Sequence, residues 1–144
     1  ELLDFRRAVE PLIARVAAQK RQKSDLETIE GTLERMSGTL VEPDYMRFDT
    51  KFHIAVAAAT RNRWFRRATE QLRADLNDAL SLLPESETWH RRLSGEHEAI
   101  AVAIRERDPD AAERAAREHV VNSDTSVRAV LAAIRRRRGA GKEA

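Results

Sequence analysis

The apolar residues of this chain recur every three or four positions along most of its length. This spacing places them on one face of an α-helix, and no segment shows the strict alternation typical of a β-strand. Short connections separate the periodic segments, so we expect an all-α antiparallel bundle of six or seven helices. The helices are predicted over residues 2–20, 24 to about 37, 43 or 44 to about 60, 63–83, 94 to about 107, and 109 to about 136.

A few residues mark where these helices begin or break. Ser24, with Glu27 three residues later, resembles a capping box that opens the second helix. Pro11 lacks a backbone donor and should kink or locally break the first helix. Residues 85–93 fit either a loop or a short helix, which leaves the count at six or seven, and Ser94 can cap the helix that follows.

The apolar stripes also predict which side chains face the core. In the first helix the stripe includes Phe5 and Leu12, and in the fourth it includes Trp64. Phe48 and Phe52 lie four residues apart in the third helix and form a stripe of their own. We therefore expect all five side chains to be buried.

Composition and charge exclude several classes of protein. The chain has 144 residues, enough for one domain with a core, and it begins at Glu1, so we expect it to be a piece of a longer protein. It has no cysteine, which excludes disulfides and thiolate metal sites and favours a reducing cytoplasm. No apolar run approaches the length of about 18 residues that spans a membrane. Acidic and basic residues interleave along most of the chain and the net charge is only +2, as on a solvated helix surface. The one basic run, Arg135–Arg138, fits a solvated helix end, with a nucleic-acid contact as the alternative.

The third predicted helix carries a carboxylate and an imidazole on one face. Asp49 and His53 lie four residues apart, which brings their Cβ atoms to about 5–6 Å on a helix. Such a pair is able to hold a metal ion. The spacing alone is a weak signal, because many helical pairs of this kind lie on the surface.

A second pair of histidines comes from the last two helices. His97 precedes Asp108 by eleven residues, and His119 follows it by eleven. Asp108 and Pro109 form a strong stop and restart, so the two helices make a hairpin that returns both histidines to one level. Three imidazoles and one carboxylate suit a divalent transition metal such as Zn²⁺, Ni²⁺ or Mn²⁺. The alternative is a plain helical scaffold whose histidines are incidental.

Several segments together resemble the FCD domain, the C-terminal ligand-binding domain of FadR-type regulators in the GntR family of bacterial transcription factors. The likeness covers nearly the whole chain, and the order and spacing of its motifs carry it. The segments are residues 5–12, Asp49-x-x-Phe52-His53 followed by Ala59-x-x-Asn62, Glu96-His97-x-x-Ile100-x-x-Ala103-Ile104, and Asp108 followed by His119-Val120.

The resemblance implies one divalent metal ion (Zn, Ni or Mn) held by Asp49, His53, His97 and His119. It also implies a small organic acid as effector, a homodimer, and DNA binding only through an N-terminal winged helix-turn-helix domain that this chain lacks. Residues 1–138 would form the effector-binding domain and 139–144 a disordered tail. We find no heptad seam that would itself show the dimer.

Three further residues are candidates for contacts with the effector. Arg6 could bind a carboxylate through its guanidinium group, although it could equally pair with Glu10 one turn away. Asn122 and Ser126 follow His119 by three and seven residues and would line the pocket. His90 has no counterpart in the family motif and is expected to face solvent.

An enzyme is the alternative function. Three histidines around a metal with open coordination positions can activate water. However, the chain has no His-Glu-x-x-His motif, and no carboxylate is evidently left over as a general base. The resemblance instead implies a regulator that catalyses no reaction.

Overall fold

The computed structural model describes residues 1–39, 44–80 and 86–140. These residues form helices and contain no strand, which confirms the predicted all-α class. The helices are α1 (Leu2–Lys20), α2 (Lys23–Ser37), α3 (Asp44–Ala59), α4 (Arg63–Leu80), α5 (Glu87–Arg105) and α6 (Pro109–Ala140). None of them is long and apolar enough to cross a bilayer.

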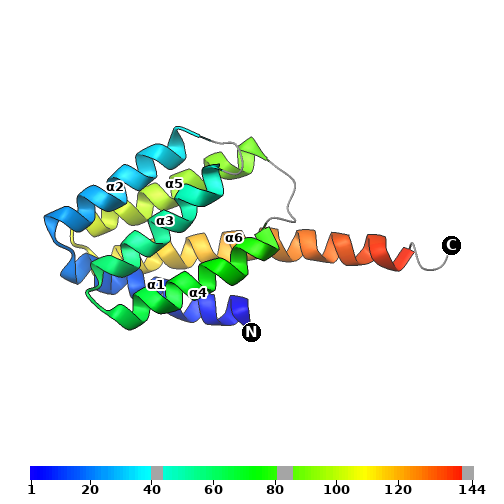
Figure 1. Cartoon of the computed structure of the whole chain (residues 1–144), viewed down its shortest axis with the longest axis horizontal. Coiled ribbons are helices and arrows are strands. Elements are labelled where there is room, and N and C mark those ends of the chain that lie inside the picture. The colour runs from blue at the N-terminus through cyan, green and yellow to red at the C-terminus, as the bar shows by residue number, and fades with distance from the viewer. Residues whose placement is uncertain (40–43, 81–85, 141–144) are drawn as a thin grey trace.

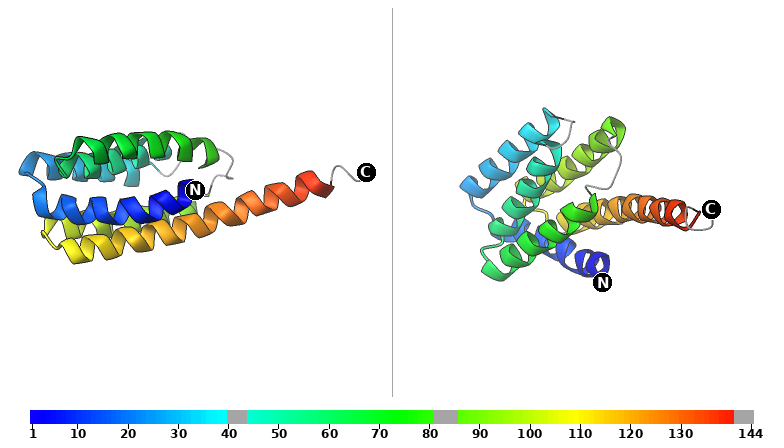
Figure 2. Two further views of the ribbon diagram at one scale, coloured as in Figure 1. Left: turned by 90° about the horizontal axis from the view of Figure 1, so that it is seen from below. Right: turned by 45° about the vertical axis from the view of Figure 1, so that its right-hand side comes forward.

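The bundle is built around the pairing of α1 with α6 (Figure 1). α5 packs against α6 and α2, and α2 packs against α3. α4 packs mainly against α3 and touches α1. Seen from below, α1 lies between α4 and α6, and α6 continues well past the rest of the bundle (Figure 2). Residues of α1, α2, α3, α5 and α6 therefore meet in one interior.

Two tight turns connect neighbouring helices. Arg61 and Arg107 adopt positive φ values of 58° and 56°, which reverse the chain after α3 and α5. Asn62 then caps α4 and Asp108 caps α6, each accepting a hydrogen bond of 2.9 Å from a backbone N–H of the first turn. The predicted stop and restart at Asp108 is confirmed.

The core follows the predicted stripes over much of the chain. Phe48 and Phe52 of α3 are both buried, and Phe52 lies among the apolar residues of α1, α5 and α6. The largest cluster of buried apolar residues is Ile13, Ala14, Ala17, Ala18, Ile29, Phe52, Ala55, Val56, Ala57, Ala59, Ile100, Ala101, Ala103, Ile104, Ala112 and Ala116. Its many alanines let the helix backbones approach closely.

Three large side chains predicted to be buried lie outside. Phe5 and Leu12 are 46% and 44% exposed, and Trp64 is 61% exposed. In α1, the inner face is occupied by Arg6 and Glu10 together with apolar residues, so part of the apolar stripe faces outward. Trp64 instead lies against two neighbouring arginines of α4, whose guanidinium groups are 5.0 and 5.5 Å from its ring.

The N-terminal part of the chain differs from prediction at two points. α2 begins after Gln22, which shares reciprocal capping hydrogen bonds with Asp25, so Ser24 and Glu27 do not form the capping box. α1 continues through Pro11 to Lys20. The predicted break is absent because packing of α1 against α3 and α6 offsets one missing hydrogen bond.

The last two helices also begin or end elsewhere than predicted. Ser86 caps α5, accepting a hydrogen bond of 3.2 Å from the backbone of Trp89, so α5 includes the ambiguous segment and Ser94 lies buried within it. This accounts for six helices in the described residues instead of seven. α6 reaches Ala140, past the predicted end near residue 136 and into the predicted tail. Two of the segments outside the described residues are 81–85 and 141–144. The predicted end of the fourth helix falls in the first of them.

Candidate metal centre

Asp49 and His53 of α3 both point into the bundle. Their side chains are almost fully buried, and the Asp49 Oδ1 atom lies 3.8 Å from the His53 Nε2 atom. The i, i+4 spacing produces this arrangement, because Phe52 and the apolar residues that follow turn the same side of α3 inward. The local sequence alone therefore orients Asp49 and His53 toward the interior.

His97 of α5 and His119 of α6 enter the same space from the opposite side. Their ring centroids are 4.4 Å apart. This closeness follows from the hairpin at Asp108, because each histidine lies eleven residues from that turn. Ring nitrogens of His53, His97 and His119 all lie within 4.8 Å of one another. All three side chains are buried, so the cluster is an interior feature of the fold.

The distances between these atoms fit the edges of a metal coordination shell. The Nε2 atoms of His53 and His97 are 3.2 Å apart, and the His97 Nε2 atom is 3.2 Å from the Asp49 Oδ1 atom. Metal–nitrogen bonds of about 2.0–2.1 Å place neighbouring ligands about 2.8–3.4 Å apart in octahedral or tetrahedral geometry. The residues present therefore fit a divalent transition metal.

Carboxylates lie close to the Nδ1 atoms of two of the histidines. The Glu96 Oε2 atom lies 3.0 Å from the His119 Nδ1 atom, and the Glu10 Oε2 atom lies 3.7 Å from the His53 Nδ1 atom. A carboxylate at Nδ1 favours a proton there and leaves the Nε2 lone pair for a metal. Among the described residues, the buried Nδ1 atom of His97 has no hydrogen-bond partner. Sequence reasoning identified neither Glu10 nor Glu96 as part of the site.

Burial keeps the three imidazoles neutral. It lowers the pKa of His53 and of His97 to about 3, and Arg73 beside His97 acts in the same direction. The pKa of His119 also lies well below its ordinary value, first through burial and then through the neighbouring histidines. Neutral imidazole is the form that binds a metal.

Guanidinium groups balance the buried carboxylates around the centre. Glu10 pairs with Arg6, Asp49 with Arg73, and Asp124 with Arg6 and Arg7. Burial raises the pKa of Glu10, but the charges of Arg6 and Arg73 and the contact with His53 outweigh that effect and lower it overall. Glu10 therefore remains ionised beside His53.

Arg6 joins the centre to the pairing of α1 and α6. Its guanidinium group donates to Glu10 at 2.9 Å and to Asp124 at 3.2 Å, binds Ser123, and lies 3.3 Å from the Nε2 atom of His119. Arg7 binds the second Asp124 oxygen at 2.8 Å. Arg6, which was predicted to contact the effector, therefore lies inside the site. It also forms the ion pair with Glu10 that was the alternative prediction.

Arg73 of α4 is a site residue that sequence reasoning missed. It is 1% exposed and binds Asp49 Oδ2, the oxygen opposite the one that faces the histidines. Burial lowers its pKa to about 10, so the group remains charged. A signal was present, because Thr69, Leu72 and Leu76 share its helix face and an arginine within such a buried stripe is unusual.

A small cavity beside His119 has room for about one water molecule. Its walls include Arg6, Asp49, Arg73, Trp89, His119 and Ser123. The buried Arg73 Nε and Trp89 Nε1 atoms have no hydrogen-bond partner among the described residues.

Asn122 and Ser126 lie to one side of this cavity. Asn122 donates to Glu96 at 2.9 Å, and Ser126 accepts a hydrogen bond of 3.1 Å from Arg92. The next residue along, Ser123, lines the cavity instead. Only one of the three predicted effector contacts, Arg6, is brought to the cavity wall.

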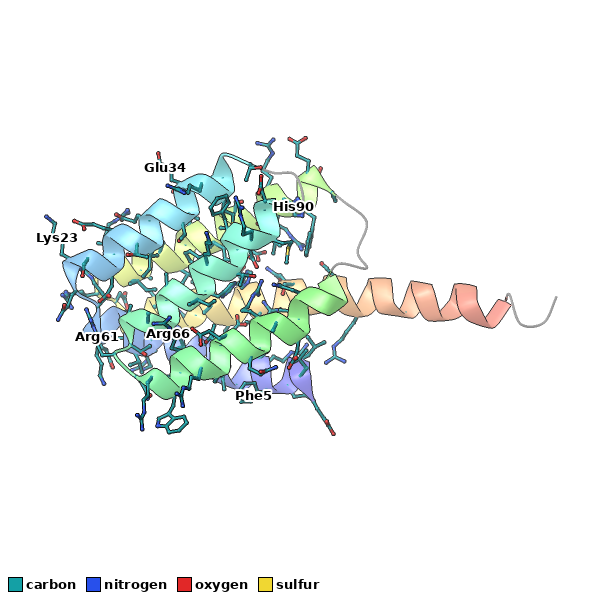
Figure 3. The ribbon with its side chains drawn as sticks, viewed as in Figure 1. Phe5, Lys23, Glu34, Arg61, Arg66 and His90 are labelled. Carbon is teal, nitrogen blue, oxygen red and sulfur yellow. The ribbon has the colours of Figure 1, made fainter. Side chains whose placement is uncertain are left out.

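His90 was expected to face solvent but is 2% exposed. Its ring stacks on Tyr45 at 4.1 Å between centroids, and its backbone carbonyl accepts a hydrogen bond of 3.0 Å from the Tyr45 hydroxyl. The expectation was wrong because α5 begins seven residues earlier than predicted and brings His90 into the bundle. His90 lies on the upper part of α5 (Figure 3).

Comparisons with known proteins agree with this architecture. A model of the FCD domain family matches residues 1–122. The HTH-type transcriptional regulator LutR of Bacillus subtilis (strain 168) is 31% identical over 135 residues, which cover 85% of this chain and 58% of LutR. The galactonate operon transcriptional repressor of Escherichia coli (strain K12) is 32% identical over 130 residues, covering 83% and 53%. The chain thus spans little more than half the length of these relatives.

Solved structures share the fold at lower identity. The Streptococcus agalactiae GntR structure matches with a TM-score of 0.77 and 21% identity, covering 87% of this chain and 57% of that one. E. coli McbR/YncC matches with a TM-score of 0.79 and 14% identity, covering 88% and 62%. Since the family model covers most of the chain, the chain belongs to the FCD domain family, the all-α effector-sensing domains of GntR-type transcription regulators.

Proposed function

We propose that this chain is the metal-dependent, effector-sensing and dimerising part of a GntR-family DNA-binding transcription regulator. The observation that carries the proposal is the interior cluster of His53, His97 and His119, with Asp49 beside it. One divalent ion, Zn²⁺, Ni²⁺ or Mn²⁺, would bind these four side chains. The ion would supply a Lewis-acidic centre with coordination positions left for an effector.

We expect the effector to be a small organic acid. Arg73 and Trp89 line the cavity next to His119, and their Nε and Nε1 atoms have no partner among the described residues, so a carboxylate or hydroxyl oxygen there would accept from them. The name of the E. coli relative refers to a galactonate operon, and galactonate is a hydroxy acid. Because the cavity now admits about one water, an effector would have to widen it.

Side-chain contacts connect the cavity with the start of α1. Asp124 lies little more than one helical turn after His119 on α6 and binds both Arg6 and Arg7 in the first two turns of α1. In the longer regulator, the DNA-binding domain would precede α1. An effector that favours one position of Arg6 would shift α1 relative to α6, which is the differential binding that allostery requires.

We propose no catalytic step. The relatives are transcription regulators by name. The carboxylates nearest the histidines are engaged: Asp49 with Arg73, Glu10 with Arg6, and Glu96 with His119. None of these three carboxylates is therefore free to act as the base that activates water.

Elemental analysis of the purified chain, with thermal melts before and after chelation, tests the metal. We expect about one ion per chain and a lower melting temperature after chelation, because a ligand bound to the folded state stabilises it. If no metal binds even after Zn²⁺, Ni²⁺ or Mn²⁺ is added, the metal-dependent proposal is wrong.

A thermal-shift series with small carboxylates on the metal-loaded chain tests the effector. Arg73→Lys keeps a positive charge near Asp49 but removes the Nε donor, so it should reduce the shift produced by the best acid. Arg67→Lys is the matched control, because Arg67 is exposed on the same helix. Equal shifts in the two variants would remove Arg73 from the effector site.

A further inference from the structure

A second small cavity lies beside His53 and has room for about one water molecule. Its polar wall residues are Glu10 of α1, His53 of α3 and Thr69 of α4, and the rest of its wall is apolar. A buried water molecule is held where about two to four polar groups can bind it, whereas purely apolar cavities stay dry. This cavity therefore offers enough polar groups to hold a water molecule.

The hydrogen bonding of these three residues is incomplete. Thr69 is 2% exposed, and its hydroxyl group has no hydrogen-bond partner among the described residues. The Oε1 atom of Glu10 accepts from Arg6 at 2.9 Å, but its Oε2 atom lies 3.7 Å from the His53 Nδ1 atom. That separation exceeds the length of about 2.7–3.2 Å for a direct hydrogen bond and calls for a bridging water molecule.

The packing of α4 against α3 places Thr69 next to His53. The two helices are antiparallel neighbours (Figure 1), and Arg73 of α4 binds Asp49 of α3. Thr69 precedes Arg73 by four residues, and His53 follows Asp49 by four. Because four residues make about one helical turn, the ion pair sets Thr69 beside His53 one turn further along.

We propose that one water molecule in this cavity binds Thr69, Glu10 and His53, and that Thr69 orients the His53 ring through it. The water accepts a hydrogen bond from the His53 Nδ1 atom and donates one to Glu10 Oε2, with the Thr69 hydroxyl as its third partner. The proton of His53 is then held on Nδ1, and its Nε2 atom, 3.2 Å from that of His97, remains for a metal.

The bridge would give His53 the support that His119 receives directly. The Nδ1 atom of His119 lies 3.0 Å from the Glu96 carboxylate, within hydrogen-bond distance. Thr69 is thus a positioning residue that does not touch the ion. The inference rests on the proposed function for the metal, whereas the water bridge itself does not require an ion.

Removing the Thr69 hydroxyl tests the water bridge in the metal-free chain. Thr69→Val keeps the shape of the side chain, and it should lower the urea midpoint of unfolding because the water loses a partner. Loss of a buried hydroxyl that binds nothing would leave the midpoint unchanged or raise it. Thr60→Val is the matched control, because Thr60 is also buried and its hydroxyl donates to Ala57 at 2.6 Å. Both variants should unfold at lower urea in the presence of a chelator, and a Thr69→Val chain as stable as the wild type overturns the proposal.

The position of the proton on His53 tests whether the bridge orients the ring. Nitrogen-15 NMR of the imidazole groups in the metal-free chain distinguishes the Nδ1–H form from the Nε2–H form. We expect mainly Nδ1–H in the wild type and a larger fraction of Nε2–H in Thr69→Val. Thr69→Ser keeps the hydroxyl and should return the ring toward the wild-type form, and Thr60→Val should match the wild type. The same tautomer in Thr69→Val and the wild type would overturn the role of Thr69.

The Zn²⁺ affinity of the same variants measures the consequence for the metal. Titration against a chelating dye should show a dissociation constant about 10–100-fold higher in Thr69→Val, the range for residues that orient a metal ligand. Thr69→Ser should recover most of this loss, and Thr60→Val should bind Zn²⁺ as the wild type does despite its lower stability. Unchanged affinity in Thr69→Val would exclude Thr69 as a positioning residue. If even the wild type binds no Zn²⁺, the metal proposal is wrong, and the urea and NMR results still decide the water bridge.

Discussion

Four buried histidines occupy two different environments in this bundle. His53, His97 and His119 turn ring nitrogens toward one another in the interior, with Glu10 and Glu96 behind two of them. His90 is equally buried, but its ring stacks on Tyr45 and borders Trp89. Burial alone thus does not mark a metal site. What distinguishes the cluster is that its nitrogens converge and that carboxylates orient them.

The largest expected difference between the two environments is in the response to acid. In the metal-free folded chain the pKa of His53 and of His97 is about 3, against about 6.5 when unfolded. Between these values the unfolded chain binds protons that the folded chain does not. The free energy of unfolding should therefore fall as pH drops below about 6.5, by up to about 1.4 kcal/mol per pH unit for each histidine.

Urea denaturation in the presence of a chelator at pH 7, 6 and 5 measures this slope. Loss of the ion pairs of Glu10, whose pKa is lowered, adds to the decline at the acid end. Unchanged stability from pH 7 to pH 5 would mean that the three imidazoles are not held neutral by burial.

Removing one converging nitrogen should abolish tight metal binding. His97→Leu fills a similar volume and discards an Nδ1 atom that has no partner among the described residues, so the fold should persist. We expect metal affinity to fall by more than about 100-fold, beyond the loss expected for a residue that only orients a ligand. Metal titration and circular dichroism check both points, and a variant that still binds one ion tightly would exclude His97 as a ligand.

Removing the charge of Glu96, the carboxylate next to His119, should lower metal affinity less. Glu96→Gln keeps the shape at the Nδ1 atom of His119 but removes the charge, and metal affinity should fall by about 10–100-fold. Glu98→Gln is the control, because Glu98 is exposed two residues further along α5. Identical affinities for the two variants would show that Glu96 does not orient His119.

The smallest effect on metal binding is expected at His90. His90→Phe preserves a flat ring against Tyr45, so the free energy of unfolding should change by less than about 1.5 kcal/mol. Metal content and the chelator response of the melting temperature should match the wild type. A loss of metal in this variant would contradict the division of the histidines into two environments.

Much of the fold and half of the site follow from local patterns. The i, i+4 spacing aims Asp49 and His53 together, and the equal arms around Asp108 bring His97 to His119. Both arguments use only helix geometry, which depends on few neighbours. Phe5 shows where such reasoning fails, because a helix with apolar residues on two faces does not itself say which face is inside.

Contacts between residues far apart in the sequence determine the rest of the site. Arg73 and Glu10 belong to the centre because α4 and α1 place them against Asp49, Arg6 and His53. Along its own helix Glu10 resembles an ordinary surface charge, and Arg73 differs from one only by its place in a buried stripe. His90 was misplaced for a related reason, since α5 starts where tertiary packing supports it.

The sequence by itself determined the all-α bundle, the hairpin of the last two helices, and the two pairs Asp49/His53 and His97/His119, because helical periodicity and capping are local properties. Only the tertiary structure decided which charges are buried in pairs around those side chains and which apolar residues of α1 remain outside. Burial and ion pairing depend on segments far apart in the chain, such as Arg6 and Asp124, which local spacing does not relate.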